Sequence, residues 1–104
     1  MKLSVIIPAF NEEETILKVL HRLNETKVDI VEYEFIVIND GSTDNTKKIL
    51  DNNQNLFSTM INNEKNYGKG YSVKEGLKIA KGDYIIFQDA DLEYDPLDFK
   101  KFIK

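Results

Sequence analysis

The sequence of 104 residues contains no cysteine, which excludes disulfide bonds and thiolate metal sites and is compatible with a reducing compartment. It also lacks any apolar stretch near the roughly 18 residues that a bilayer-spanning helix requires. The first apolar run, "LSVII", is too short for a signal peptide and leads into Pro8 and the acidic "NEEE". We therefore expect a cytoplasmic protein. Contact with the cytoplasmic face of a membrane would need a surface patch or further sequence in a longer parent protein.

Concentrated positive charge is absent too. The 14 Lys and Arg residues are scattered, and the 18 Asp and Glu residues give a net charge of −4. Because a nucleic-acid interface needs a concentrated basic face, we expect no nucleic-acid partner. No internal repeat, low-complexity tract or Pro/Gly/Ser linker interrupts the chain. We therefore expect residues 1–104 to belong to a single domain.

What the chain does have is an alternation of strand and helix patterns. Three of its four strand patterns are near-continuous apolar runs, which is typical of parallel strands covered on both faces. The alternation predicts an α/β fold, with an open, mainly parallel sheet and helices on both of its faces. The predicted strands are 3–7, 34–38, 57–61 and 83–87, and the predicted helices are 12–25, 44–52, 70–81 and one that begins at Asp95.

Two of the helix patterns predict details that a structure can check. Asn11 precedes the apolar stripe of the helix over 12–25 and is a candidate N-cap. In the helix over 70–81, Val73, Leu77 and Ala80 share one face, which predicts that this face packs on the sheet.

The last predicted helix has barely begun its apolar stripe when the sequence stops at Lys104. This interruption predicts a truncated domain, whose C-terminal part lies in a longer protein. A sheet of this kind needs further strands beside its last one, and their absence would leave an apolar edge exposed. Exposed edges of this sort favour association, so we expect homo-oligomers of the isolated chain.

The chemistry is expected where the strands end. In open α/β sheets, ligands bind outside the carboxyl ends of the strands. All four segments that leave these ends are polar and rich in turn formers and acids. They read "PAFNEE", "NDGSTDN", "NNEKNYGKG" and "QDADLEYD". Their convergence on one edge of the sheet is the main functional signal in the sequence.

Three familiar ligand loops are missing from these segments. No Walker A motif exists in the sequence. The dinucleotide pattern begins at Gly68 and Gly70 but has Val73 in place of the third glycine. A calcium loop that begins at Asp89 would place Tyr94 where the essential glycine belongs. None of these three readings fits.

What remains is Asp89-Ala90-Asp91, directly after an apolar strand. Charges do not lie beside a core without compensation, and two carboxylates one residue apart can share one hard cation. Mg²⁺ or Mn²⁺ suits this arrangement, because both accept one or two carboxylates together with phosphate oxygens and water. An acidic loop repels a diphosphate unless such a cation bridges them. The alternative is a solvated acidic turn that caps the helix beginning at Asp95.

The segments "SVIIPAFNEEETI", "VINDGSTDNT" and "NYGKGYSVKEGLKIAKGDYIIFQDADLEYDP" together resemble the N-terminal half of an inverting family 2 glycosyltransferase. The resemblance covers essentially the whole chain and is greatest to polyprenyl-phosphate hexosyltransferases of the dolichol-phosphate mannose synthase type. It implies a GT-A fold with a Rossmann-like nucleotide-binding half. It also implies a D-x-D motif that binds Mg²⁺ or Mn²⁺ beside a nucleoside-diphosphate sugar.

The resemblance also implies roles for individual residues. Nucleotide-sugar binding is expected of Pro8, Ala9, Phe10 (where the family usually has Tyr), Asn11, Glu12, Asp40, Gly41, Ser42, Lys69, Gly70, Asp89, Ala90 and Asp91. Within this set, Asp40 would hydrogen-bond the base. Asp91 would be the first metal ligand, with Asp89 and Glu93 as further candidates. A turn role for Asp40 and a helix N-terminal role for Glu12 or Glu93 remain alternatives.

The function implied is transfer of a hexose from a donor of the GDP-mannose or UDP-glucose type, assisted by metal and with inversion. The acceptor implied is a polyprenyl or dolichyl phosphate, and a glycan acceptor, as in polysaccharide synthesis, is the alternative. A catalytic base and the acceptor site would lie beyond Lys104. The 104-residue chain itself would then be an inert nucleotide-binding module. A metal-binding domain without a phosphate ligand is a weaker alternative.

Overall fold

The computed structural model describes residues 1–91, so Glu93 and the predicted helix at Asp95 lie outside the described residues. The elements follow one another as strand and helix in turn, as the sequence predicts. They are β1 (Lys2–Ala9), α1 (Ile16–Glu25), β2 (Glu32–Asp40), α2 (Thr46–Asp51), a 3-10 turn η1 (Gln54–Leu56), β3 (Thr59–Asn63), α3 (Lys69–Ile79) and β4 (Tyr84–Phe87). The predicted helix over 12–25 thus begins four residues later, at Ile16.

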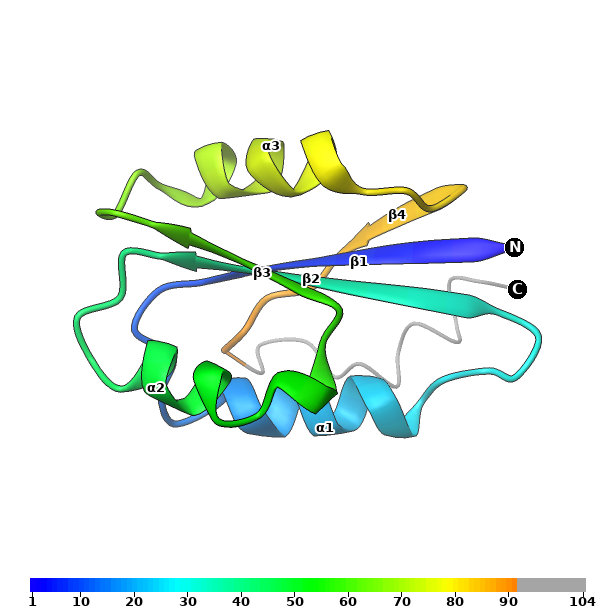
Figure 1. The fold of residues 1–104 in the computed structure, drawn as a ribbon, viewed down its shortest axis with the longest axis horizontal. Coiled ribbons are helices and arrows are strands. Elements are labelled where there is room, and N and C mark those ends of the chain that lie inside the picture. Colours follow the sequence, from blue (N-terminus) through cyan, green and yellow to red (C-terminus); the bar gives the residue numbers. More distant parts are fainter. Residues whose placement is uncertain (92–104) are drawn as a thin grey trace.

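The four strands form one parallel sheet in the order β3-β2-β1-β4. Figure 1 shows α1 and α2 on one face of this sheet and α3 on the other. The predicted open α/β fold with helices on both faces is therefore confirmed. The third strand was predicted two residues too early, because the apolar pattern at 57–61 includes the extended approach to β3.

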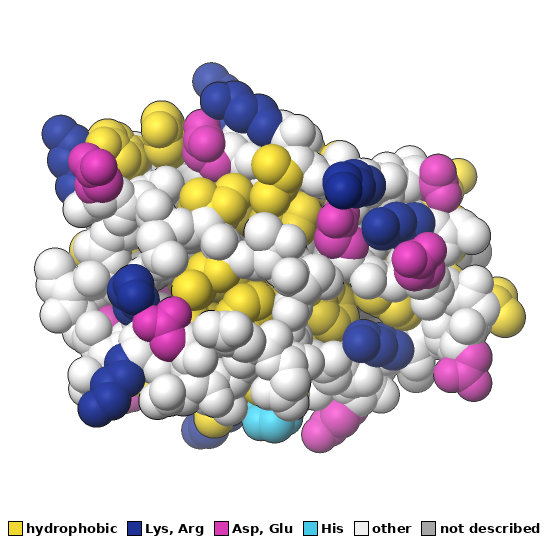
Figure 2. Space-filling model, viewed as in Figure 1, with side chains coloured by type: hydrophobic (Ala, Val, Ile, Leu, Met, Phe, Trp, Pro, Cys, Tyr) yellow, Lys and Arg dark blue, Asp and Glu magenta, His cyan; other side chains and the backbone are white. Residues whose placement is uncertain are grey.

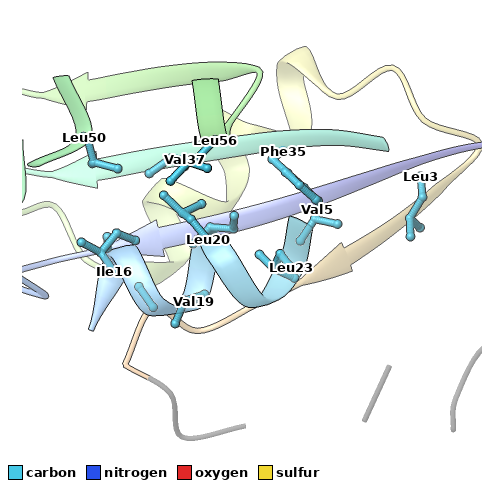
Figure 3. Packing of buried hydrophobic residues seen from close by; sticks show 13 residues of the cluster. Leu3, Val5, Ile16, Val19, Leu20, Leu23, Phe35, Val37, Leu50 and Leu56 are labelled. Carbon is cyan, nitrogen blue, oxygen red and sulfur yellow. The ribbon is translucent and has the colours of Figure 1, made fainter. Parts of the chain in front are cut away.

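The larger core fills the space between the sheet and the two helices α1 and α2. Ile16, Val19, Leu20 and Leu23 of α1 are almost fully buried against strand residues such as Val37 (Figure 3). Each fully buried aliphatic side chain of this kind stabilises the fold by about 1.5–3 kcal/mol. The continuous apolar strands and the apolar stripe of α1 therefore account for most of the burial.

Helix α3 packs on the sheet only partly through the predicted face: Ala80 packs against the buried core on this side of the sheet, as predicted. Its buried residues are Ser72 and Gly76, whereas Leu77 is 41% exposed. A Cβ on Gly76 would lie 2.8 Å from a methyl group of Ile6 and 3.1 Å from one of Ile38. The β-branched side chains on this face of the sheet thus require a small residue on the helix. An apolar stripe alone does not reveal that requirement.

The edge strand β4 exposes large apolar side chains. Tyr84 is 62% exposed and Phe87 is 51% exposed, and in residues 1–91 the strand pairs only with β1. Over the face drawn in Figure 2, acidic and basic side chains are interspersed, with apolar side chains showing between them. An unpaired edge of this composition favours association with another chain.

We expect the isolated chain to self-associate in sedimentation velocity experiments, and to do so less when β4 is made charged. The double variant Tyr84→Lys, Phe87→Lys should shift the distribution towards monomer, because lysine on an edge strand opposes strand pairing. Ile30→Lys is a matched control, since Ile30 is 85% exposed in the loop between α1 and β2. A wild-type chain that stays monomeric at every concentration would contradict the expectation.

Candidate functional site

A cavity of about 340 Å³ lies at the carboxyl ends of β1, β2 and β4, and the loop before α3 contributes to its lining. The strand order reverses between β1 and β4, so the cavity sits at the topological switch point where α/β sheets bind ligands. Its lining residues come from all four strand-end segments. They are Pro8, Ala9, Phe10, Glu12, Asp40, Asn66, Gly68, Lys69, Asp89, Ala90 and Asp91.

Most of the residues expected at a nucleotide-sugar site therefore lie together. Four of the expected residues do not line the cavity but belong to the segments that do: Asn11, Gly41, Ser42 and Gly70. Two lining residues, Asn66 and Gly68, were not predicted. Both lie in the polar segment that follows β3 and in the stretch that carries the family resemblance, and Gly68 also begins the incomplete dinucleotide pattern.

Asn11 is a loop residue, so its prediction as an N-cap is wrong. It has a φ of 52°, which asparagine tolerates better than most residues. Its side-chain oxygen accepts hydrogen bonds from the backbone N–H groups of Thr43 at 2.8 Å and Asp44 at 3.3 Å. Its own N–H donates to the Ser42 hydroxyl at 3.0 Å. Asn11 and Ser42 thus tie the loop after β1 to the loop after β2.

Asp40 ends β2 in a buried position, with 3% of its surface exposed. Its carboxylate accepts hydrogen bonds from the Asn63 side chain and from the backbone N–H groups of Tyr67 and Gly68, each at 2.9 Å. These three hydrogen bonds compensate the Asp40 carboxylate for the water that it loses on burial. Asp40 also borders the cavity.

The segment after β4 places two carboxylates at the cavity. Lys69 forms an ion pair with Asp89, and both residues line the cavity. The Ala90 carbonyl accepts a hydrogen bond from the Thr15 hydroxyl at 2.6 Å, which fixes the backbone between the two aspartates. Thr15 was not predicted, because no sequence pattern connects a residue before α1 with one 75 positions later.

The cavity carries more negative than positive charge. Partial burial and the neighbouring Asp91 raise the pKa of Glu12, with smaller contributions from Asp44 and Asp89, while a hydrogen bond with Thr15 opposes the shift. Lys69 is the one basic residue among the lining residues within 1–91. A bound cation would relieve this repulsion.

The carboxylates of Asp89 and Asp91 offer the hard oxygen donors that Mg²⁺ and Mn²⁺ prefer. In the described part of the chain, no three acidic, histidine or cysteine side chains are grouped so as to hold a metal. The residues therefore fit an ion that takes one or two carboxylates from the protein and its other ligands from phosphate and water.

The fold and the site define an α/β domain with an acidic ligand cavity, and comparison with known proteins places it in a family. The model of glycosyl transferase family 2 matches residues 4–104. The chain belongs to glycosyl transferase family 2. The resemblance to family 2 glycosyltransferases is thereby confirmed, together with the GT-A fold.

Three similar proteins illustrate the relationship. An undecaprenyl-phosphate 4-deoxy-4-formamido-L-arabinose transferase of Proteus mirabilis is 35% identical over 98% of this chain and 32% of its own length. The structure of S. aureus TarS in complex with UDP-GlcNAc is 32% identical, with a TM-score of 0.82 over 99% of this chain and 30% of that one. Glucosyl-3-phosphoglycerate synthase from Mycobacterium tuberculosis, in complex with Mn²⁺, UDP and glucosyl-3-phosphoglycerate, is 30% identical, with a TM-score of 0.75 over 95% of this chain and 37% of that one.

The chain thus spans about a third of the length of each of these proteins. Among residues 1–91, no helix is both long and apolar enough to cross a bilayer.

Because the pKa of Glu12 is raised, we expect that replacing Glu12 with a neutral residue increases the free energy of unfolding, and that the increase depends on pH. A folded-state pKa above the ordinary glutamate pKa of 4.5 means that folding favours the protonated acid. The stability that Glu12 contributes is therefore present below that value and is lost as the pH rises through the folded-state pKa. At pH 7, Glu12→Gln should raise the free energy of unfolding of the metal-free chain, by up to about 0.5 kcal/mol. The gain should vanish near pH 4.

Thermal unfolding of the wild-type protein and of Glu12→Gln, followed from pH 4 to pH 8, measures the difference in their free energies of unfolding. Glu14→Gln is the control, because Glu14 is an exposed neighbour in the same loop. An equal effect of the two substitutions at pH 7 would contradict the assignment to Glu12.

Proposed function

We propose that this chain forms the donor-binding part of a hexosyltransferase that uses a nucleoside-diphosphate sugar of the GDP-mannose or UDP-glucose type. One observation carries the proposal: Asp89 and Asp91 meet Lys69 and Glu12 around a single cavity at the switch point of the sheet. The family supports it, and so do the UDP and UDP-GlcNAc present in the two structures compared above.

Asp91 and Asp89 would hold a divalent cation at this site. When bound, Mg²⁺ or Mn²⁺ supplies Lewis-acid stabilisation of the diphosphate leaving group. The Mn²⁺ present in the mycobacterial synthase supports this choice. Glu93 would be a further ligand.

The chain's own residues would bind and orient the donor. Pro8, Ala9 and Phe10 present a mostly apolar wall of the cavity, which suits the nucleoside part. Lys69 carries a positive charge into the cavity and would pair with a phosphate oxygen. Such fixed contacts orient the anomeric carbon for attack from the face opposite the leaving group, with inversion.

The acceptor we propose is a polyprenyl or dolichyl phosphate, bound by the longer protein at the cytoplasmic face of a membrane. The Proteus mirabilis relative supports this, since its name specifies undecaprenyl phosphate. A lipid phosphate is already anionic and needs little help from a base.

Nucleotide binding should require the divalent cation. Calorimetry of GDP and UDP with the 104-residue chain should give binding with Mg²⁺ or Mn²⁺, and at least tenfold weaker binding with chelator. Asp91→Asn should remove the metal-dependent part while changing the free energy of unfolding by less than about 0.5 kcal/mol, because Asp91 is exposed.

Asp29→Asn is the matched control, since Asp29 is exposed in the loop between α1 and β2, at the opposite edge of the sheet. Equal affinity with and without chelator would refute the bridging role of the metal.

The isolated chain should bind the donor without transferring its sugar. An acceptor phosphate needs a binding site of its own, because the donor would occupy the cavity described above. Purified residues 1–104 with Mn²⁺, a nucleotide sugar and undecaprenyl phosphate should therefore yield no glycolipid in a radiolabel assay. Formation of labelled lipid would show that the chain alone is a complete transferase.

A further inference from the structure

Strand β4 leads directly into the segment that carries Asp89 and Asp91, so the position of these carboxylates depends on how β4 is aligned on β1. The strand has four residues, of which three are exposed and one is half-buried. The register of a strand is weakly specified by its side chains when neither face is well buried. Contacts outside the strand must therefore supply much of the alignment.

Such contacts exist at the amino end of β4. The Ser4 hydroxyl, which is fully buried in β1, donates a hydrogen bond to the Glu34 carboxylate of β2 at 2.7 Å and accepts one from the Gly82 N–H at 2.8 Å. The Lys81 N–H donates to the same Glu34 oxygen at 2.9 Å. We call Ser4, Glu34, Lys81 and Gly82 the β4 latch. The latch ties the turn before β4 to both β1 and β2.

The turn before β4 also approaches β1 very closely. A Cβ on Gly82 would lie 2.6 Å from both the backbone nitrogen and the Oγ of Ser4, so glycine is required here. The next residue, Asp83, exchanges two hydrogen bonds with Lys2. Its N–H donates to the Lys2 carbonyl at 2.7 Å, and its side chain accepts one from the Lys2 N–H at 2.9 Å. The pairing of β4 with β1 thus starts from a fixed point.

The acceptor in the β4 latch is charged near neutral pH. Partial burial opposes the ionisation of Glu34, but hydrogen bonds from the Lys81 N–H and the Ser4 hydroxyl, together with the charges of Lys2 and Lys81, lower its pKa below the ordinary value of 4.5. Hydrogen bonds to a charged acceptor are about twice as strong as those between neutral groups. Glu34 is therefore the residue on which the latch depends most.

We propose that Glu34 is a positioning residue for the metal site: the β4 latch sets the register of β4 on β1, and thereby the place of Asp89 and Asp91 at the cavity. This inference rests on the proposed function, which assigns the cation to the two aspartates. A slip of β4 by one residue would move them by about 3.3 Å. Metal ligands must be held within about 0.5 Å, so a slipped strand would lose the site.

Amide hydrogen exchange tests the latch without metal or nucleotide. In Glu34→Ala, the amides of Lys81 and Asp83 should exchange at least about tenfold faster than in the wild-type chain, because Lys81 loses its acceptor and β4 loses its fixed start. Glu34→Gln keeps an acceptor oxygen and should give a smaller increase at the same amides, which decides the matter if the alanine variant does not fold. Glu32→Ala, at an exposed position of the same strand, should change neither amide. Unchanged exchange in the Glu34 variants would overturn the proposal.

Metal affinity tests whether the latch positions the aspartates. Glu34 lies near the amino end of β2, whereas the cavity lies at the carboxyl ends of the strands. Calorimetric titration of Mn²⁺ in the presence of UDP should nevertheless show at least about threefold weaker binding for Glu34→Ala than for the wild-type chain. The titrations are made at a temperature at which circular dichroism shows every variant to be folded.

Ser58→Ala is the matched control for this titration. The Ser58 hydroxyl also accepts a hydrogen bond from a strand amide, the Phe35 N–H at 3.0 Å, but it does so beside β3, at the other edge of the sheet. Its loss should leave the affinity for Mn²⁺ unchanged. Equal losses in Ser58→Ala and Glu34→Ala would indicate general destabilisation and would overturn the positioning role.

Gly82→Ala breaks the latch from its other side. The added methyl group should separate the turn from Ser4 and weaken Mn²⁺ binding as Glu34→Ala does. Wild-type affinity for Mn²⁺ in this variant would contradict the proposal. Failure of the wild-type chain to bind Mn²⁺ with UDP would instead refute the proposed function, and the exchange experiment would still decide whether the latch holds β4.

Discussion

The parallel pairing of β1 with β2 on one side and with β4 on the other determines where the candidate site lies. Because the three strands run in the same direction, the segments after Ala9, Asp40 and Phe87 all leave the sheet at one edge. The helices α1 and α2, which follow the first two of these segments, turn back over a face of the sheet, so the segments leave the sheet close together. Residues separated by more than 75 positions therefore share one cavity, as Glu12 and Asp91 do.

This convergence concentrates negative charge. Asp89, Asp91 and Glu12 border one cavity in which Lys69 is the basic lining residue of the described chain, and partial burial together with the charge of Asp91 raises the pKa of Glu12. A protein gains no stability from such repulsion, so the arrangement is understandable only when a ligand relieves it. A divalent cation together with a diphosphate would balance the negative charge of the carboxylates and the positive charge of Lys69.

The sequence predicts much of the fold, because most of its strands are continuous apolar runs. Such strands are buried on both faces, so their burial can be predicted without knowing which residues they contact. It also predicts which segments meet, because strand direction alone places them. It predicts the face of α3 only in part, at Ala80, because the approach of Ile6 and Ile38 requires the small residue Gly76 rather than a continuous apolar stripe. The loop contacts of Asn11 and Thr15 depend on partners far along the chain, and local patterns carry no information about them.

These long-range hydrogen bonds connect the loops into one unit. Asn11 ties the loop after β1 to the loop after β2, and Thr15 ties it to the segment after β4. Asp40 ties the end of β2 to the loop before α3. Each connection uses a side chain on one segment and a backbone group on another, so the lining residues are held by groups that need not touch a ligand. Pre-organisation of this kind lowers the entropy that binding must offset, and it means that the affinity of the cavity depends on residues behind its surface as much as on those that line it.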